Sequence, residues 1–174
     1  MTGELLDYFS TWTQGAIGQA HLASALIALL SGACVILLRK GTRLHRSLGY
    51  AYVITMLILN GTALMKYDLT GAANMFHFFA IGSLLTIAAA YIAIRIRGSK
   101  RTAAAKAHGS LMIWSYFGLV MALIAEVVTR AYPFMLHGDG GWFRFTSALV
   151  VFSLIAAFLT QRLIQFELAK TFRG

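Results

Sequence analysis

Apolar residues dominate five long stretches of the chain, and polar residues gather in the short connections between them. The stretches cover about residues 17–38, 48–65, 72–94, 107–129 and 143–160. A helix needs about 20 apolar residues to cross the hydrocarbon core of a bilayer. None of the stretches alternates in the manner of a barrel strand. The pattern therefore predicts five transmembrane helices. Because the connections are too short for another domain, we expect a single membrane domain over residues 1–174.

The composition supports this interpretation and excludes other classes of protein. Of the 174 residues, 59% are hydrophobic and only 12% are charged, against about 45–50% and about 25% in soluble domains. A core of this size cannot enclose so many apolar side chains. A soluble enzyme and a disordered tail are therefore excluded, and the lone Cys34 excludes a disulfide scaffold. We predict an all-α integral membrane protein.

The basic residues are distributed very unevenly along the chain. Twelve of the fifteen lie in the first connection, the third connection and the C-terminal tail, and only Lys66, Arg130 and Arg144 fall on the other side. Cytoplasmic loops carry the excess of Lys and Arg, so we expect the N-terminus outside and the C-terminus in the cytoplasm. This distribution accounts for the formal charge of +9 without a nucleic-acid partner. We expect the first thirteen residues to lie in the outer interface.

The first four predicted helices carry one histidine each, and the fifth carries none. Ionisable side chains within a span are costly and usually functional. With antiparallel neighbours, His21 and His77 lie at the outer level, and His45 and His108 lie at the inner level. In an up-down four-helix bundle, the first and third helices are diagonal, as are the second and fourth. We therefore expect a four-helix bundle with two facing imidazoles at each level, and a fifth helix at the C-terminal end.

Two facing imidazoles are the axial ligands of a bis-histidine haem. The pattern favours two molecules of heme b, one at each level, which together would form an electron path across the membrane. The spacing leaves open copper or another metal, and also histidines that only form hydrogen bonds between helices. A covalent c-type haem is excluded because the chain has no Cys-x-x-Cys-His.

Four further charged residues are candidates for the same site. Eighteen residues make five helical turns, so Arg39 should share a face with His21, and Arg95 with His77. Both arginines could then bind haem propionates, although anchoring at the membrane surface explains them as well. Glu126 should face inward and pair with Arg130 four residues later. A functional and a structural role remain equally open for Glu126.

The segments HLASALIALLSGACVILLRKGTRLHRSLGYAYV, KAHGSLMIWSY and TRAY resemble the bacterial membrane proteins classified as domain of unknown function 2306. The resemblance covers about residues 17–132. It matches the family pattern at residues that include His21, His45, His108 and Arg130. Where many members have an arginine before Ser-Tyr, this chain has Trp114. The resemblance implies a bacterial inner membrane protein and supplies no reaction.

The four histidines also resemble the arrangement in cytochrome b561 proteins, in which four consecutive helices each supply one haem ligand. The chain has no close sequence match to that family. This resemblance implies two b haems and transmembrane electron transfer. Our hypothesis is a di-haem b-type cytochrome, an electron-transfer oxidoreductase that uses a quinone, a small reductant or a redox partner protein. The alternative is a non-catalytic scaffold or anchor subunit of a larger membrane complex. A weaker alternative is a transporter that uses Glu126, Asn60 and Asn74. Oligomerisation is left open.

Overall fold

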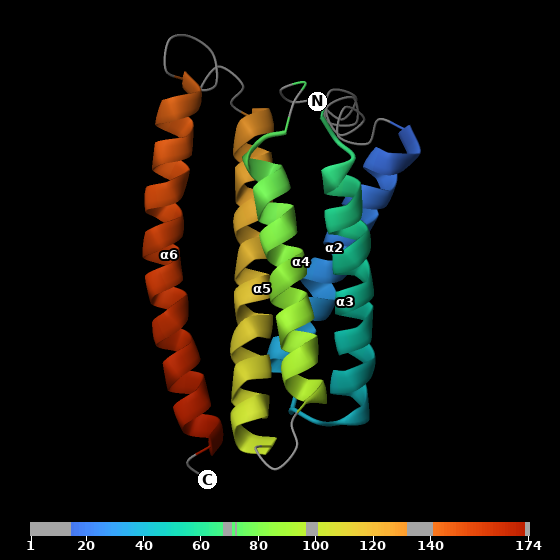
Figure 1. The fold of residues 1–174 in the computed structure, drawn as a ribbon, viewed down its shortest axis with the longest axis vertical. Coiled ribbons are helices and arrows are strands. Elements are labelled where there is room, and N and C mark those ends of the chain that lie inside the picture. The colour runs from blue at the N-terminus through green and yellow to red at the C-terminus, as the bar shows by residue number, and fades with distance from the viewer. Residues whose placement is uncertain (1–14, 68–70, 72, 97–100, 132–140, 173–174) are drawn as a thin grey trace, which may run out of the picture. The chain divides into compact units, whose positions relative to one another are not determined.

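The computed structural model describes residues 15–67, 71, 73–96, 101–131 and 141–172. All regular secondary structure within these residues is helical (Figure 1). The helices are α2 (Gly15–Leu37), α3 (Arg43–Leu64), α4 (Met75–Arg95), α5 (Arg101–Ala131) and α6 (Gly141–Phe172). Each contains a segment that is long and apolar enough to cross a membrane. The predicted all-α integral membrane protein with five spans is therefore confirmed.

Three helices extend well beyond the apolar stretches from which they were predicted. α3 begins at Arg43 rather than near residue 48, α5 begins at Arg101 rather than near 107, and α6 continues to Phe172. Apolar composition marks only the part of a helix that suits hydrocarbon, whereas backbone hydrogen bonding continues into polar sequence. The 31 residues of α5 correspond to about 46 Å of helix, which exceeds a hydrocarbon core of about 30 Å.

The chain divides into two compact units, Met1–Ala88 and Ala89–Gly174, and the boundary falls inside α4. The first unit contains α2, α3 and most of α4. The second contains the end of α4 together with α5 and α6. Each unit is described by itself below. The single membrane domain expected over residues 1–174 stays a prediction.

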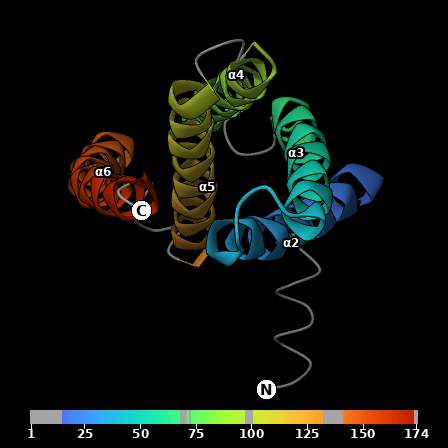
Figure 2. The ribbon, with the colours of Figure 1, turned by 90° about the horizontal axis from the view of Figure 1, so that it is seen from below.

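In the first unit, α2 and α3 lie side by side (Figure 2). The buried residues of α2 are mostly small: Gly18, Ser24, Ala28, Ser31, Gly32 and Val35. Those of α3 are mostly larger: Tyr52, Thr55, Met56, Leu59 and Asn60. Small residues let helix backbones approach closely in a membrane. Four of these buried α2 residues follow one another at intervals of four, three and four residues, which is the spacing of a coiled-coil seam. They are Ser24, Ala28, Ser31 and Val35.

A tight turn joins α2 to α3, and side chains cap both helix ends. Gly41 has a φ of +82°, a left-handed conformation that glycine adopts without strain. The Lys40 ammonium donates to the carbonyls of Val35 and Ile36 at the end of α2. Thr42 is the N-cap of α3 and accepts from the His45 backbone N–H at 3.1 Å.

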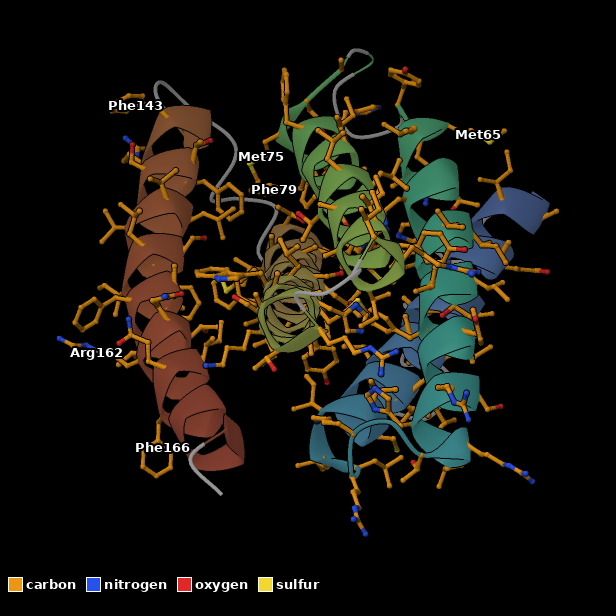
Figure 3. The ribbon with its side chains drawn as sticks, turned by 60° about the horizontal axis from the view of Figure 1, so that its bottom comes forward. Met65, Met75, Phe79, Phe143, Arg162 and Phe166 are labelled. Atoms are coloured by element: carbon orange, nitrogen blue, oxygen red, sulfur yellow. The ribbon has the colours of Figure 1, made fainter. Side chains whose placement is uncertain are left out.

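In the second unit, α6 packs on α5 and leaves most of its surface exposed. Among its described side chains, the large buried ones are Phe145, Leu149 and Ile164. Phe143 and Phe166 project away from the helix with exposures of 77% and 66% (Figure 3). Apolar side chains of a spanning helix are stable in contact with lipid, so this exposure agrees with a bilayer environment.

Candidate functional site

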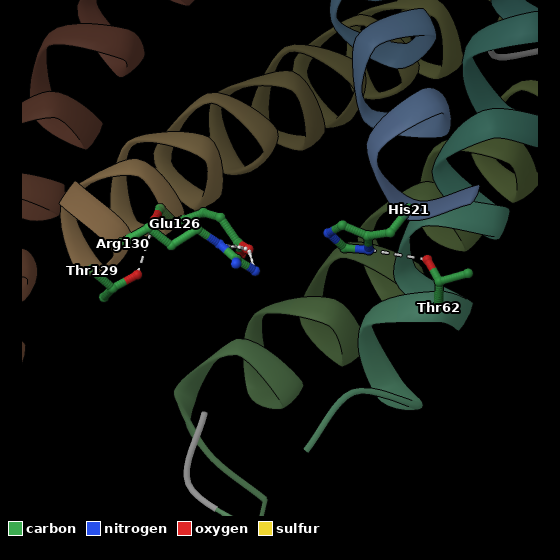
Figure 4. A network of polar contacts seen from close by, with 5 residues as sticks. All are labelled: His21, Thr62, Glu126, Thr129 and Arg130. Atoms are coloured by element: carbon green, nitrogen blue, oxygen red, sulfur yellow. Dashed lines mark hydrogen bonds and ion pairs between the residues drawn. The ribbon is translucent and has the colours of Figure 1, made fainter. Parts of the chain in front are cut away.

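His21 lies in the second turn of α2 and bonds to the neighbouring helix. Its Nδ1 atom is 3.0 Å from the Thr62 hydroxyl of α3 (Figure 4). Thr62 lies two residues before the end of α3 at Leu64, so His21 is near the end of the first unit at which α2 begins and α3 ends. We call this the Thr62 end of the unit.

His77 lies in the first turn of α4. Because α4 begins shortly after α3 ends, His77 also lies at the Thr62 end. Only 6% of its surface is exposed. Its ring stacks on Tyr67 with 4.6 Å between ring centroids. Within the described residues, its Nε2 atom is buried without a hydrogen-bond partner. A buried nitrogen of this kind is rare and requires an explanation.

The other ring nitrogen of His77 takes part in the cap of α4. The Asn74 side chain accepts from the Phe76 backbone N–H at 3.0 Å, as an N-cap does. The Asn74 backbone N–H in turn lies 3.2 Å from His77 Nδ1, which is the reciprocal contact of a capping box. Nδ1 also lies 3.3 Å from Asn74 Oδ1. If Nδ1 accepts, Nε2 carries the proton of the neutral ring. If Nδ1 donates to Asn74 Oδ1, Nε2 carries the lone pair.

His45 occupies the same helical position in α3 that His77 occupies in α4. It is the third residue of α3, in the first turn after the Thr42 cap, and its side chain is half-buried. It lies at the end of the first unit opposite His21. The sequence signals Thr-x-x-His and Asn-x-x-His mark both helix starts, and a search for helix caps would have found them.

His108 belongs to the second unit and bonds to a neighbouring helix in a similar way to His21. Its Nδ1 atom is 2.9 Å from the carbonyl oxygen of Ala90 in α4. A carbonyl only accepts, so His108 Nδ1 carries the proton of this bond. In the neutral ring, the lone pair is then on Nε2. The predicted pairing of His45 with His108 would join the two units and stays a prediction.

The two arginines expected at the inner level are both exposed. α2 ends at Leu37, so the helical register that should bring Arg39 onto the face of His21 stops before Arg39. Arg95 is the last residue of α4, and its Nε donates to the Tyr91 hydroxyl at 2.9 Å. Its guanidinium lies 5.0 Å from the Tyr91 ring centroid. Propionate binding by Arg39 and Arg95 stays a prediction.

The expected ion pair between Glu126 and Arg130 is formed in α5 (Figure 4). Arg130 Nε and a terminal guanidinium nitrogen both donate to Glu126 Oε1, at 2.8 Å and 2.5 Å. Both side chains are half-buried. The Thr129 hydroxyl donates to the Glu126 backbone carbonyl at 2.9 Å, so this part of α5 is held by local contacts.

Two residues that sequence reasoning placed on a transport path have structural partners. Asn60 is buried, and its amide donates to the Met56 carbonyl at 2.7 Å and to the Ser83 hydroxyl of α4 at 3.1 Å. Asn74 caps α4, as described above. Thr62, which holds His21, was not anticipated, because nothing in the sequence shows which residue of α3 faces His21.

No group of three or more His, Cys, Asp or Glu side chains that could hold a metal ion occurs in the described part of the chain. A bis-histidine haem needs only two protein ligands, because the porphyrin supplies the others. His137 and the N-terminal segment expected in the outer interface lie outside the described residues.

Comparison with known proteins identifies the family. A family model described as predicted membrane protein (DUF2306) matches residues 18–166. The chain therefore belongs to this family, and the predicted membership is confirmed. With five helices that can span a membrane, it is a multi-pass membrane protein. No curated protein and no solved structure matches the chain.

Proposed function

We propose that this protein is a b-type membrane cytochrome that carries electrons across the bilayer and holds heme b between histidine pairs. The observation that carries the proposal is His77 Nε2, which is buried without a hydrogen-bond partner in the described part of the chain. An axial ligand bond would satisfy this nitrogen, provided that Nδ1 donates its proton to Asn74 Oδ1. His21 lies at the same end of the same unit and is the proposed second ligand.

The contacts of His21 and His108 support the proposal. A histidine that ligates a metal usually donates its other ring N–H to a protein acceptor, which fixes the ring and raises its basicity. His21 Nδ1 bonds to Thr62 and His108 Nδ1 bonds to the Ala90 carbonyl. We assign His45 and His108 to a second haem. When bound, haem supplies a one-electron iron couple. The exposed side chains of Arg39 and Arg95 are the proposed partners of the propionates.

The electron donor and acceptor must come from outside the chain, which has no flavin or nicotinamide motif. We propose a quinone, a small reductant or a redox protein in these roles. The cytochrome b561 arrangement, with ligands paired between alternate helices, is the architecture that this proposal adopts.

Visible spectroscopy of the purified protein tests the proposal. We expect a low-spin b-type signal in reduced-minus-oxidised spectra, and its loss in His21→Ala and His77→Ala. His137→Ala is the matched control, because the fifth histidine is not a proposed ligand, and its spectrum should equal that of the wild type. A protein that stays colourless after haem is supplied during expression would refute the proposal.

A conservative variant separates ligation from folding. In His77→Met, a thioether can replace the imidazole, and a Met/His pair raises the haem potential. We therefore expect a coloured protein with a more positive midpoint potential. Haem quantification tests the second site, since two haems per chain are expected in the wild type and one in His45→Ala or His108→Ala.

The alternative function is a non-catalytic subunit that anchors or scaffolds a larger membrane complex. The same contacts favour it, because His21 and His108 each bond to a neighbouring helix and His77 contributes to a helix cap. Interhelical hydrogen bonds in membranes contribute about 0.6 kcal/mol on average. A colourless protein in which His21→Ala costs stability of this order would support the alternative.

For location, we propose the bacterial inner membrane, with the N-terminus outside and the C-terminus in the cytoplasm. The uneven distribution of Lys and Arg supports this orientation. C-terminal fusions provide the test, because green fluorescent protein fluoresces in the cytoplasm and alkaline phosphatase is active outside it. A bright fluorescent fusion and an inactive phosphatase fusion are expected, and the reverse result would overturn the orientation.

A further inference from the structure

We infer that Thr62 is a positioning residue that holds His21 in the tautomer with its proton on Nδ1 and its lone pair on Nε2. The inference concerns the hydrogen bond of 3.0 Å between His21 Nδ1 and Thr62 Oγ1. Either atom of such a contact can donate, because a hydroxyl and a neutral imidazole each both donate and accept. The other bonds of Thr62 decide the direction.

The Thr62 hydroxyl has one proton, and α3 itself engages that proton. Oγ1 lies 2.9 Å from the carbonyl of Ile58 and 2.9 Å from the carbonyl of Leu59, in donor geometry to both. Back-bonding of this kind, to the carbonyls three and four residues earlier, is common for threonine in a helix. With its proton directed along α3, Thr62 accepts from His21, and on this ground we assign the proton to His21 Nδ1.

Two other residues serve as internal references for this assignment. His108 makes its Nδ1 contact with a carbonyl, which cannot donate, so its tautomer does not depend on any hydroxyl. Thr55 lies on the same helix as Thr62 and makes the same two kinds of back-bond, to Ala51 at 2.8 Å and to Tyr52 at 3.0 Å. Within the described residues, Thr55 makes no hydrogen bond to an imidazole.

The consequence for haem chemistry rests on the proposed function. A hydrogen bond from Nδ1–H to an acceptor increases the electron donation of Nε2 to a metal. More donation favours ferric iron and lowers the midpoint potential. Thr62 would therefore set both which nitrogen of His21 binds iron and how strongly it donates.

Nitrogen-15 NMR of histidine-labelled protein tests the tautomer directly. In wild-type protein purified without haem, we expect the His21 proton on Nδ1. In Thr62→Val, which has nearly the same shape and no acceptor, the proton should move toward Nε2. Thr62→Ser and Thr55→Val should leave His21 unchanged, and the His108 signal should be the same in all four proteins. A wild-type His21 protonated on Nε2 alone would overturn the inference without any variant.

Redox titration of the haem-bound protein tests the consequence. We expect Thr62→Val to raise the midpoint potential and to weaken haem retention by about tenfold or more, as loss of an outer-shell partner does. Thr62→Ser and Thr55→Val should retain the wild-type potential. An unchanged potential in Thr62→Val would overturn the redox role of Thr62. Absence of haem from all variants would refute the proposed function, whereas the tautomer result would stand.

Discussion

The two units of the molecule differ in how their helices are held together. In the first unit, α2 and α3 meet along a continuous seam, and hydrogen bonds cross between helices from His21 to Thr62 and from Asn60 to Ser83. In the second unit, His108 also bonds to the α4 carbonyl of Ala90, but the described part of α6 contributes few large side chains to the interior. In the most apolar 18-residue segment of each helix, 28% of the residues are buried in α2 but only 11% in α6.

This difference matters because lipid provides no hydrophobic force that drives helices together. Helix association in a bilayer depends on close packing and on polar bonds, and α2 with α3 has both. The first unit can therefore hold side chains in fixed geometry, as a ligand site requires. α6 has an apolar surface suited to lipid and no histidine, so it adds little to such a site.

The largest expected effect comes from overfilling the seam between α2 and α3. Ala28 is fully buried on α2, and Ala28→Leu should lower the free energy of unfolding by about 1–3 kcal/mol, as overpacking of tight interiors does. The matched control is Ala148→Leu on the exposed surface of α6, expected to change stability by less than about 0.5 kcal/mol. SDS-induced unfolding in mixed micelles measures both. Equal losses would show that the two helices are equally well packed.

A smaller effect is expected at the bond between α3 and α4. A double-mutant cycle of Asn60→Ala with Ser83→Ala should give a coupling energy of about 0.6 kcal/mol and at most about 1.7. The control cycle pairs Asn60→Ala with Thr86→Ala, because the Thr86 hydroxyl donates to the Gly82 carbonyl of its own helix and to no other helix among the described residues. Coupling in the control as large as in the test cycle would mean that the effect is not this hydrogen bond.

The smallest effect is expected at the ion pair of the second unit. Glu126 and Arg130 are half-exposed and lie four residues apart on one helix, so a cycle with Glu126→Gln and Arg130→Gln should give a coupling of about 0.3–0.5 kcal/mol. The coupling should fall further in 1 M salt, because salt screens exposed charges. A salt-independent coupling above 1 kcal/mol would place this pair in a low-dielectric site and remove the contrast between the units.

Hydropathy was sufficient to predict five membrane-spanning helices. Unpaired backbone groups are so costly in hydrocarbon that a long apolar segment can cross it only as a helix or in a closed barrel. It could not predict where the helices begin. Thr42 and Asn74 set the starts of α3 and α4 through cap hydrogen bonds that hydropathy does not register. For the same reason, His77 was expected inside the third span and His45 at the inner edge of the second, although each lies in the first turn of its helix.

The candidate site was less predictable than the fold. One histidine per helix was visible in the sequence, and so was the ion pair of Glu126 with Arg130, because both depend on local spacing. The position of Arg39 could not be extrapolated from His21, since the helix ends at Leu37. The partners of His21 and His108 depend on how neighbouring helices are rotated, which no periodicity within a single helix determines.

The turn between α2 and α3 has a consequence for how the protein is made. The link from Leu38 to Thr42 can reach at most about 20 Å, which is less than the roughly 30 Å of the hydrocarbon core. The end of α2 and the start of α3 must therefore remain on the same face of the membrane from the moment they are inserted. Once both helices span the bilayer, the pair forms a helical hairpin, and neither helix can reverse its direction unless the other reverses with it.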